Sequence, residues 1–244
     1  MKKALVTGAA GDIGAAVVRK LSAEGYEVTG TDVEEAPGET HCVDWVQADL
    51  SSSRGRNQIA KTVGSQLDVL VNNAAVQFNK TLVGTSSSEW EMSIAVNLSA
   101  PFYLIRELRE SLARSSGSIV NVGSVHSIVS SHSVFPYAVS KSALNGLTRS
   151  TAIELASAGV RCNCVLLGAV QTKMLAAGLE RRPHPDGAEG NLRQLCDRTP
   201  LGFIATPDEI VGAISFLSDS SQSGYMTGQV LVLDGGASLK LYTE

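Results

Sequence analysis

Two hydrophobic patterns alternate along this chain. Short apolar runs predict buried strands at residues 3–7, 27–31, 45–47, 69–72, 118–122, 161–166 and 230–233. Between them, apolar residues recur at helical spacing and predict helices at 12–23, 53–63, 88–113, 137–158 and 207–217, the third bent at Pro101. This order predicts an α/β fold in which helices cover both faces of a doubly wound parallel sheet of about seven strands.

Composition narrows the class of protein. The 244 residues fit a single domain spanning 1–244, and 43% hydrophobic content is enough for a large core. A net charge of −4 gives no reason to expect nucleic acid or an anionic membrane as partner. No apolar run approaches the ~20 residues of a membrane span, and no signal peptide is evident, so we expect a cytoplasmic protein. The cysteines and histidines lack metal-ligand spacing, which predicts no metal and reduced buried thiols at Cys162 and Cys164.

The segment from about 169 to 206 differs from the rest of the chain. It is rich in Gly, Pro, Arg and His, which predicts an irregular stretch rather than a helix or strand. Such stretches in compact domains are often lids over a binding site. A loose surface excursion is the alternative.

A glycine-rich turn follows the first predicted strand and precedes the first helix. Glycines there allow a tight turn and close approach of a pyrophosphate, and the helix N-terminus favours the negative charge. The sequence therefore predicts dinucleotide contacts in the turn at Gly8, Gly11, Asp12, Ile13 and Gly14.

Polar residues also follow the next three strands. Asp32 ends the second strand, where a carboxylate can bind the adenosine ribose hydroxyls and repel a 2′-phosphate; with neighbouring Val33 offering no cation, this predicts NAD over NADP. Asp49-Leu50 follows the third strand and Asn73-Ala74-Ala75 the fourth. All these strand ends should meet at one ligand-binding edge.

Tyr137 and Lys141 lie four residues apart in a predicted helix and so share one face. A lysine charge beside a phenol should lower the phenol pKa from ~10 and allow it to exchange a proton with an alcohol. Ser124, upstream at the end of the fifth strand, could donate a hydrogen bond to the substrate oxygen.

Taken together, these motifs resemble the short-chain dehydrogenase/reductase family, in its compact single-domain branch with a Rossmann-type sheet. The resemblance implies catalytic roles for Ser124, Tyr137 and Lys141, and for Asn97 as the anchor of a proton-relay water. It also implies cofactor contacts at Tyr137, Lys141, Gly168, Val170 and Thr172. The chain departs from the family pattern at Asp12 and Ala75, which replace glycines, and at Leu167, which replaces a proline and predicts a looser following loop.

The resemblance further implies an NAD-dependent oxidoreductase that interconverts a secondary alcohol, such as a sugar, polyol or hydroxy acid, and its ketone. His126 is a candidate substrate contact, although a surface histidine is the alternative. A 3-oxoacyl-thioester reductase of the same family and a non-enzymatic dinucleotide sensor remain alternatives. A serine hydrolase is disfavoured because no G-x-S-x-G surrounds Ser124. Apolar residues on more than one face of 88–113 and 137–158, together with the family habit, predict a homotetramer.

Overall fold

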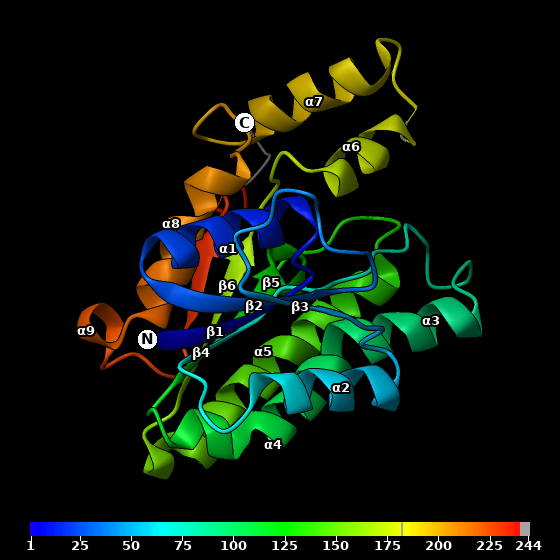
Figure 1. Ribbon diagram of the computed structural model, residues 1–244. Helices are drawn as coiled ribbons and strands as arrows, with labels where there is room; N and C mark the ends of the chain where they lie inside the picture. Colours follow the sequence, from blue (N-terminus) through cyan, green and yellow to red (C-terminus); the bar gives the residue numbers. More distant parts are fainter. Residues whose placement is uncertain (182, 240–244) are drawn as a thin grey trace.

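The computed structural model describes residues 1–181 and 183–239, and one sheet of seven parallel strands forms its centre (Figure 1). The strand order is β3-β2-β1-β4-β5-β6-β7, so the direction of winding reverses at β1, which pairs with both β2 and β4. The strands are β1 (Lys2–Thr7), β2 (Tyr26–Asp32), β3 (Asp44–Gln47), β4 (Val69–Asn72), β5 (Ser118–Ser124), β6 (Arg161–Leu167) and β7 (Val230–Leu233). In such a sheet the ligand crevice lies at the carboxyl ends of the strands beside the reversal.

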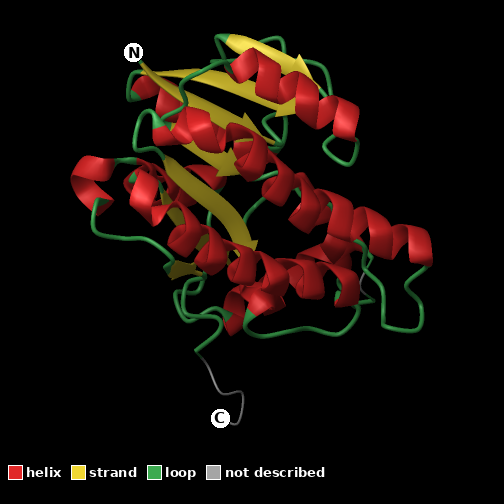
Figure 2. Cartoon of the chain, turned by 90° about the horizontal axis from the view of Figure 1, so that it is seen from below, coloured by secondary structure: helices red, strands yellow, loops and turns green. Residues whose placement is uncertain are grey.

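Helices cover both faces of the sheet, which confirms the predicted fold class. Helices α1 (Asp12–Ala23) and α8 (Pro207–Ser218) pack on one face. On the other face lie α2 (Ser53–Val63), α4 (Ala100–Ala113) and α5 (Phe135–Leu155), and Figure 2 shows the long helices crossing in front of the strands. Right-handed crossovers between parallel strands produce this arrangement of layers.

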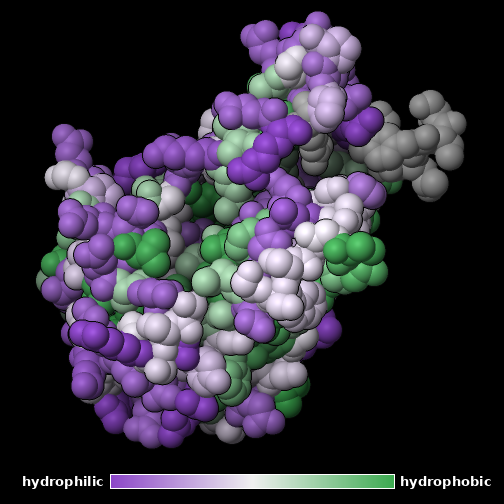
Figure 3. Space-filling view, turned by 90° about the vertical axis from the view of Figure 1, so that its right-hand side faces the viewer, coloured by the Kyte–Doolittle hydropathy of each residue, from purple (hydrophilic) through white to green (hydrophobic). Residues whose placement is uncertain are grey.

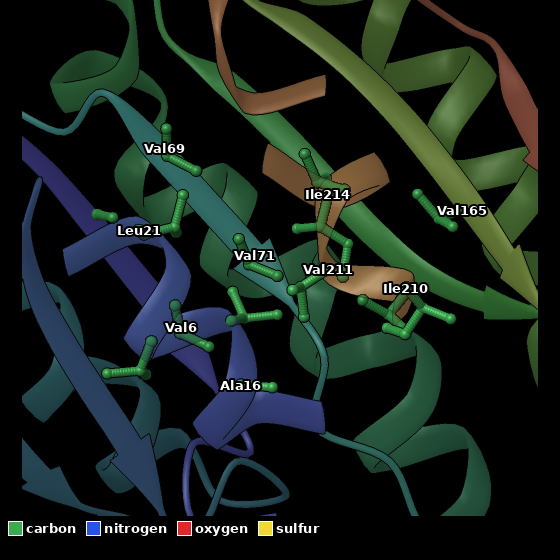
Figure 4. Packing of buried hydrophobic residues seen from close by; sticks show 14 of the residues in the cluster. Val6, Ala16, Leu21, Val69, Val71, Val165, Ile210, Val211 and Ile214 are labelled. Carbon is green, nitrogen blue, oxygen red and sulfur yellow. The ribbon is translucent and has the colours of Figure 1, made fainter. Parts of the chain in front are cut away.

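The core is divided by the sheet into two apolar layers. Side chains alternate along each strand, so Val6 faces the layer shared with α1 and α8, while its neighbour Leu5 faces α2 and α4. Figure 4 shows Leu21 from α1 and Ile214 from α8 in the same cluster as Val71 of β4 in the first layer. Each such fully buried aliphatic side chain stabilises the fold by ~1.5–3 kcal/mol.

The predicted helix at 88–113 is interrupted. It consists of α3 (Ser87–Ile94), a π-helical turn (Ala95–Ser99) and α4, which begins at Ala100. Pro101 in the first turn of α4 has no N–H to continue the regular hydrogen-bond ladder, so the change of winding falls just before it. The helix predicted from Tyr137 begins two residues earlier, at Phe135, because Pro136 is well suited to a first helical turn.

The segment 169–206 is not an irregular stretch, contrary to the sequence prediction. It holds two helices, α6 (Lys173–Glu180) and α7 (Gly187–Arg198). Pro183 and Pro185 lie in the connection between the two helices and Gly187 begins α7, so composition averaged over the segment was misleading. A short helix that was also not predicted, α9 (Ser220–Ser223), follows α8.

The two helices of this segment form a separate lobe. Figure 1 shows α6 and α7 above the rest of the molecule, and Figure 3 shows the lobe projecting from the body with a mainly hydrophilic surface. We call residues 169–206 the lid segment. Across the described residues, no helix combines the length and the hydropathy that a bilayer crossing requires.

Candidate active site

The glycine-rich turn packs closely against the loop after β4. Gly8 has a φ of 65°, and a Cβ on it would lie 2.8 Å from Ala74 Cα. A Cβ on Gly14 would overlap the Gly8 carbonyl oxygen. Only glycine fits either position, and the result is a cradle of bare backbone at the N-terminus of α1. That combination of free N–H groups and a positive helix end fits the pyrophosphate of a dinucleotide.

Thr7 and Asn73 fasten this turn to β4. The Thr7 hydroxyl accepts hydrogen bonds from the backbone N–H of Asn73 and of Ala74, each at 3.0 Å. The Asn73 amide donates to the carbonyls of Thr7 (2.9 Å) and Gly8 (3.1 Å). Thr7 was not singled out from the sequence, although a buried polar residue at the end of an apolar strand was a usable signal.

Asp32 lies at the carboxyl end of β2 beside the same turn. One of its carboxylate oxygens accepts from Ala10 N at 3.0 Å, and the other accepts from Glu34 N at 3.3 Å. The carboxylate is therefore held at the edge of the crevice, next to the exposed side chain of Val33. After β3, Asp49 accepts from the backbone and hydroxyl of Ser51, both at 2.8 Å, and Leu50 is buried.

The structure brings Ser124, Tyr137 and Lys141 together. Ser124 ends β5, and the other two lie one turn apart on α5. The Ser124 side chain interacts with the Tyr137 hydroxyl and acts to lower the pKa of the phenol. Lys141 Nζ donates to the Val122 carbonyl at 2.7 Å and lies 5.8 Å from the centre of the Tyr137 ring. All three side chains are buried at the carboxyl edge of the sheet.

The expected electrostatic effect of Lys141 on Tyr137 is not present in this arrangement. Burial raises the pKa of Tyr137 above its ordinary value, and the hydrogen bond from Ser124 opposes this only in part. Burial also lowers the pKa of Lys141 to about 8. The prediction of a lowered phenol pKa was wrong because it counted the neighbouring charge but not the loss of water around both groups.

Asn97 occupies the π-helical turn before α4. Its side-chain oxygen accepts from Val76 N at 2.8 Å, and its amide donates to Val76 O at 2.9 Å and to the Ser140 hydroxyl at 3.0 Å. Ser140 in turn donates to the Tyr137 carbonyl at 2.8 Å. Asn97 thus connects the loop after β4 with the helix that carries Tyr137. Ser140, between Tyr137 and Lys141 in the sequence, was not predicted to take part.

His126 lies beside the same group of residues. Its ring centre is 6.2 Å from that of Tyr137, with the ring planes 81° apart, and its backbone N–H donates to the Ser124 hydroxyl at 3.2 Å. The position is compatible with a substrate contact.

The loop after β6 is more firmly held than the sequence predicted. Leu167 extends β6 and pairs with Leu233, and Gly168 N donates to the Leu233 carbonyl at 2.8 Å. Val170 forms a bridge with Ala205 at the base of the lid segment, and Thr172 caps α6. These contacts replace the rigidity that a proline would supply.

Comparisons with known proteins agree with this geometry. Residues 8–238 match a family model described as enoyl-(acyl carrier protein) reductase. The chain is 31% identical over 243 residues to dehydrogenase/reductase SDR family member 6 of Xenopus laevis, covering 98% of each chain.

Two solved structures superpose closely. The ligand-free aldohexose dehydrogenase of Thermoplasma acidophilum matches with a TM-score of 0.91 and 29% identity, covering 100% of this chain and 96% of that one. A putative NAD(P)-dependent gluconate 5-dehydrogenase of Beutenbergia cavernae, with bound NADP, matches with a TM-score of 0.88 and 31% identity, covering 98% and 97%.

Proposed function

The chain belongs to the short-chain dehydrogenase/reductase family, and from this premise we propose that it is an NAD-dependent oxidoreductase that interconverts a secondary alcohol and its ketone. Members of this family bind a nicotinamide dinucleotide, and the glycine cradle at the start of α1 fits one. The observation that carries the proposal is the convergence of Ser124, Tyr137 and Lys141 beside that cradle.

Each of the three side chains has a distinct task in the proposed reaction. Tyr137 removes the hydroxyl proton of the alcohol, or returns it to the ketone oxygen in the reverse direction. Ser124 donates a hydrogen bond to the same substrate oxygen, where negative charge develops. A nicotinamide dinucleotide held at the glycine cradle would supply the hydride chemistry and, in its oxidised form, a positive charge. Lys141 is protonated below its pKa of about 8 and adds a second positive charge to the site.

Asp32 supports NAD as the preferred cofactor. Its carboxylate is held at the carboxyl end of β2, where a 2′-phosphate would meet a negative charge. Since the gluconate dehydrogenase neighbour carries NADP, its likeness does not argue for NAD, and the preference proposed here follows from Asp32 alone. The substrate class, a sugar, polyol or hydroxy acid, is supported by His126 at the Tyr137 ring and by the names of the two structural neighbours.

Two other functions differ from this proposal in testable ways. A 3-oxoacyl-thioester reductase would use the same three residues but act on a thioester and more often with NADP. A dinucleotide sensor would bind the cofactor without turnover and would not need the Tyr137 hydroxyl.

The decisive experiment is an absorbance assay of NADH formation over a panel of sugars, polyols, hydroxy acids and secondary alcohols. We expect turnover with at least one of them and a higher kcat/KM with NAD than with NADP. Tyr137→Phe should lower kcat by at least about 100-fold, the contribution usual for a general base, while NADH still binds. Near-wild-type turnover by this variant would refute the assignment. Turnover of thioesters alone would favour the first alternative, and binding without turnover the second.

A further inference from the structure

Asp12 stands where the family usually has glycine, and its carboxylate has a hydrogen-bond partner in the lid segment. It accepts a hydrogen bond from Lys173 N at 2.7 Å, across 161 residues of chain. Asp12 is the first residue of α1, and Lys173 is the first residue of α6. The contact therefore joins the glycine-rich turn to the first helix of the lid segment.

The chemistry of this contact favours it on both sides. The first N–H groups of a helix have no partner within the helix, and the N-terminus carries a partial positive charge. Thr172 satisfies Leu175 N through its own side chain, and the Asp12 carboxylate satisfies Lys173 N. The Asp12 carboxylate lies near the N-termini of both α1 and α6. The positive end of α6 therefore offsets part of the negative charge that Asp12 places beside the pyrophosphate cradle.

The rest of the lid segment is held to the body mainly at its two ends. Gln171 donates to Ala205 O (2.8 Å) from its backbone and to Ile204 O (2.6 Å) from its side chain, which closes the base of the segment. Further out, the Asn191 amide donates to Leu179 O at 2.9 Å and thereby joins α7 to α6. Half of the residues of α6 are exposed, and Leu179 is its buried residue. The position of α6 thus depends on how its first turn is held.

We infer that Asp12 is a latch that anchors helix α6 of the lid segment to the cofactor turn. The same turn that receives the pyrophosphate then also positions the lid segment on the substrate side. Asp12 acts through α6 and is a positioning residue. The consequence for substrate binding rests on the proposed function, whereas the contact itself does not.

The sequence offers a variant that removes this hydrogen bond with little other change. Lys173→Pro deletes the N–H at the first position of a helix, where proline is favoured. The preceding Thr172 has φ −139° and ψ 160°, a conformation that a following proline accepts. Lys173→Ala is the matched control, because it removes the same side chain and keeps the N–H. Asp12→Asn removes the charge from the other partner.

The first measurement is limited trypsin digestion of the full-length apoprotein, following cleavage after Arg181, which is exposed at the end of α6. We expect cleavage about three- to tenfold faster in Lys173→Pro, as for loss of a hydrogen bond to a charged group, and a smaller increase in Asp12→Asn, whose amide oxygen can still accept from Lys173 N. Lys173→Ala should match the wild type. The double variant Asp12→Asn/Lys173→Pro should be no faster than Lys173→Pro, because both changes act on the same interaction.

Equal cleavage rates in the wild type and in Lys173→Pro would overturn the inference, as would equally fast cleavage in Lys173→Ala. Should Asp12→Asn fail to fold, Lys173→Pro decides alone, since it leaves the turn unaltered. A second measurement uses the active alcohol found in the panel: Lys173→Pro should raise its KM at least about threefold with kcat retained. A fall in kcat at constant KM would contradict the positioning role. Absence of any active alcohol would count against the proposed function but would leave the digestion result intact.

Discussion

The side chain of Lys141 is buried in a site with almost no contact with water. Its side chain is buried, its Nζ donates to the Val122 carbonyl at 2.7 Å, and burial lowers its pKa from 10.5 to about 8. A protonated Lys141 at neutral pH is therefore costly to the fold. The difference from the ordinary pKa corresponds to about 3 kcal/mol.

This cost predicts how stability depends on pH. Lys141 is protonated below pH 10.5 in the unfolded chain but only below about pH 8 in the folded chain. The free energy of unfolding is therefore highest, with respect to this residue, above pH 10.5, and it decreases as the pH falls from 10.5 to 8. In urea unfolding, the free energy of unfolding of the wild type should rise relative to Lys141→Met by up to about 3 kcal/mol between pH 8 and 10.5. The exposed Lys61→Met on α2 serves as control and should show no such rise. A flat difference for Lys141→Met would show that the ammonium is hydrated in the folded protein.

At the residue scale, the sequence predicted the arrangement of side chains where that arrangement depends only on local backbone geometry. The spacing of Tyr137 and Lys141 needs only a helix to bring the two side chains onto one face. The directions of their pKa shifts could not be predicted, because they depend on burial by the folded chain, which the spacing of the two residues does not show. Asp12 is a similar case: its partner Lys173 is distant in sequence, and no local pattern pairs them.

At the element scale, the π-helical turn at Ala95–Ser99 positions Asn97 toward the loop after β4 rather than along the helix surface. Such turns are frequent at functional sites because they redirect one side chain without ending the helix. The three hydrogen bonds of Asn97 to Val76 and Ser140 make it a connector between the cofactor side and the Tyr137 helix.

Asn97→Asp should therefore destabilise the protein. The carboxylate can still accept from Val76 N, but it cannot donate to Val76 O and would face that carbonyl at close range. We expect the free energy of unfolding to fall by about 2–3 kcal/mol, as for an unsatisfied buried polar group beside a charge. Asn57→Asp, an exposed change of the same kind on α2, should cost less than about 0.5 kcal/mol. Equal urea midpoints for the two variants would contradict this account of Asn97.

The elements themselves were largely predictable, and the exceptions have physical causes. Strands β4 and β7 and helices α1 and α2 have the predicted bounds, because apolar runs and helical periodicity are strong there. The π-helical turn was missed because Pro101 signals a break but not its form. Helices α6 and α7 were missed because Pro183 and Pro185 between them made the whole segment look irregular.

At the scale of the whole molecule, apolar side chains remain exposed on the outer helices and at one edge of the sheet. Phe102 on α4 is 43% exposed and Ile153 on α5 78% exposed. Strand β7 is an edge strand, and Val232 on it is 39% exposed. Exposed apolar faces and an open sheet edge are surfaces that proteins usually cover. Two such surfaces on different elements could form two interfaces, which is the requirement for a tetramer with dihedral symmetry.

We expect the protein to sediment as a tetramer of the 25.6 kDa chain at micromolar concentration. We propose that the exposed apolar faces of α4 and α5 form one interface and that β7 forms the other. Phe102→Asp places a charge in the α4–α5 interface and should reduce the tetramer to a dimer held through β7. Burying an unpaired carboxylate there costs more free energy than one aromatic ring contributes. Leu82→Asp, an equally drastic change at a residue that is 65% exposed but lies outside α4, α5 and β7, should leave the tetramer intact. Analytical ultracentrifugation of the three proteins provides the check. A monomeric wild type would refute the assembly outright, and an unchanged tetramer for Phe102→Asp would exclude α4 from its interfaces.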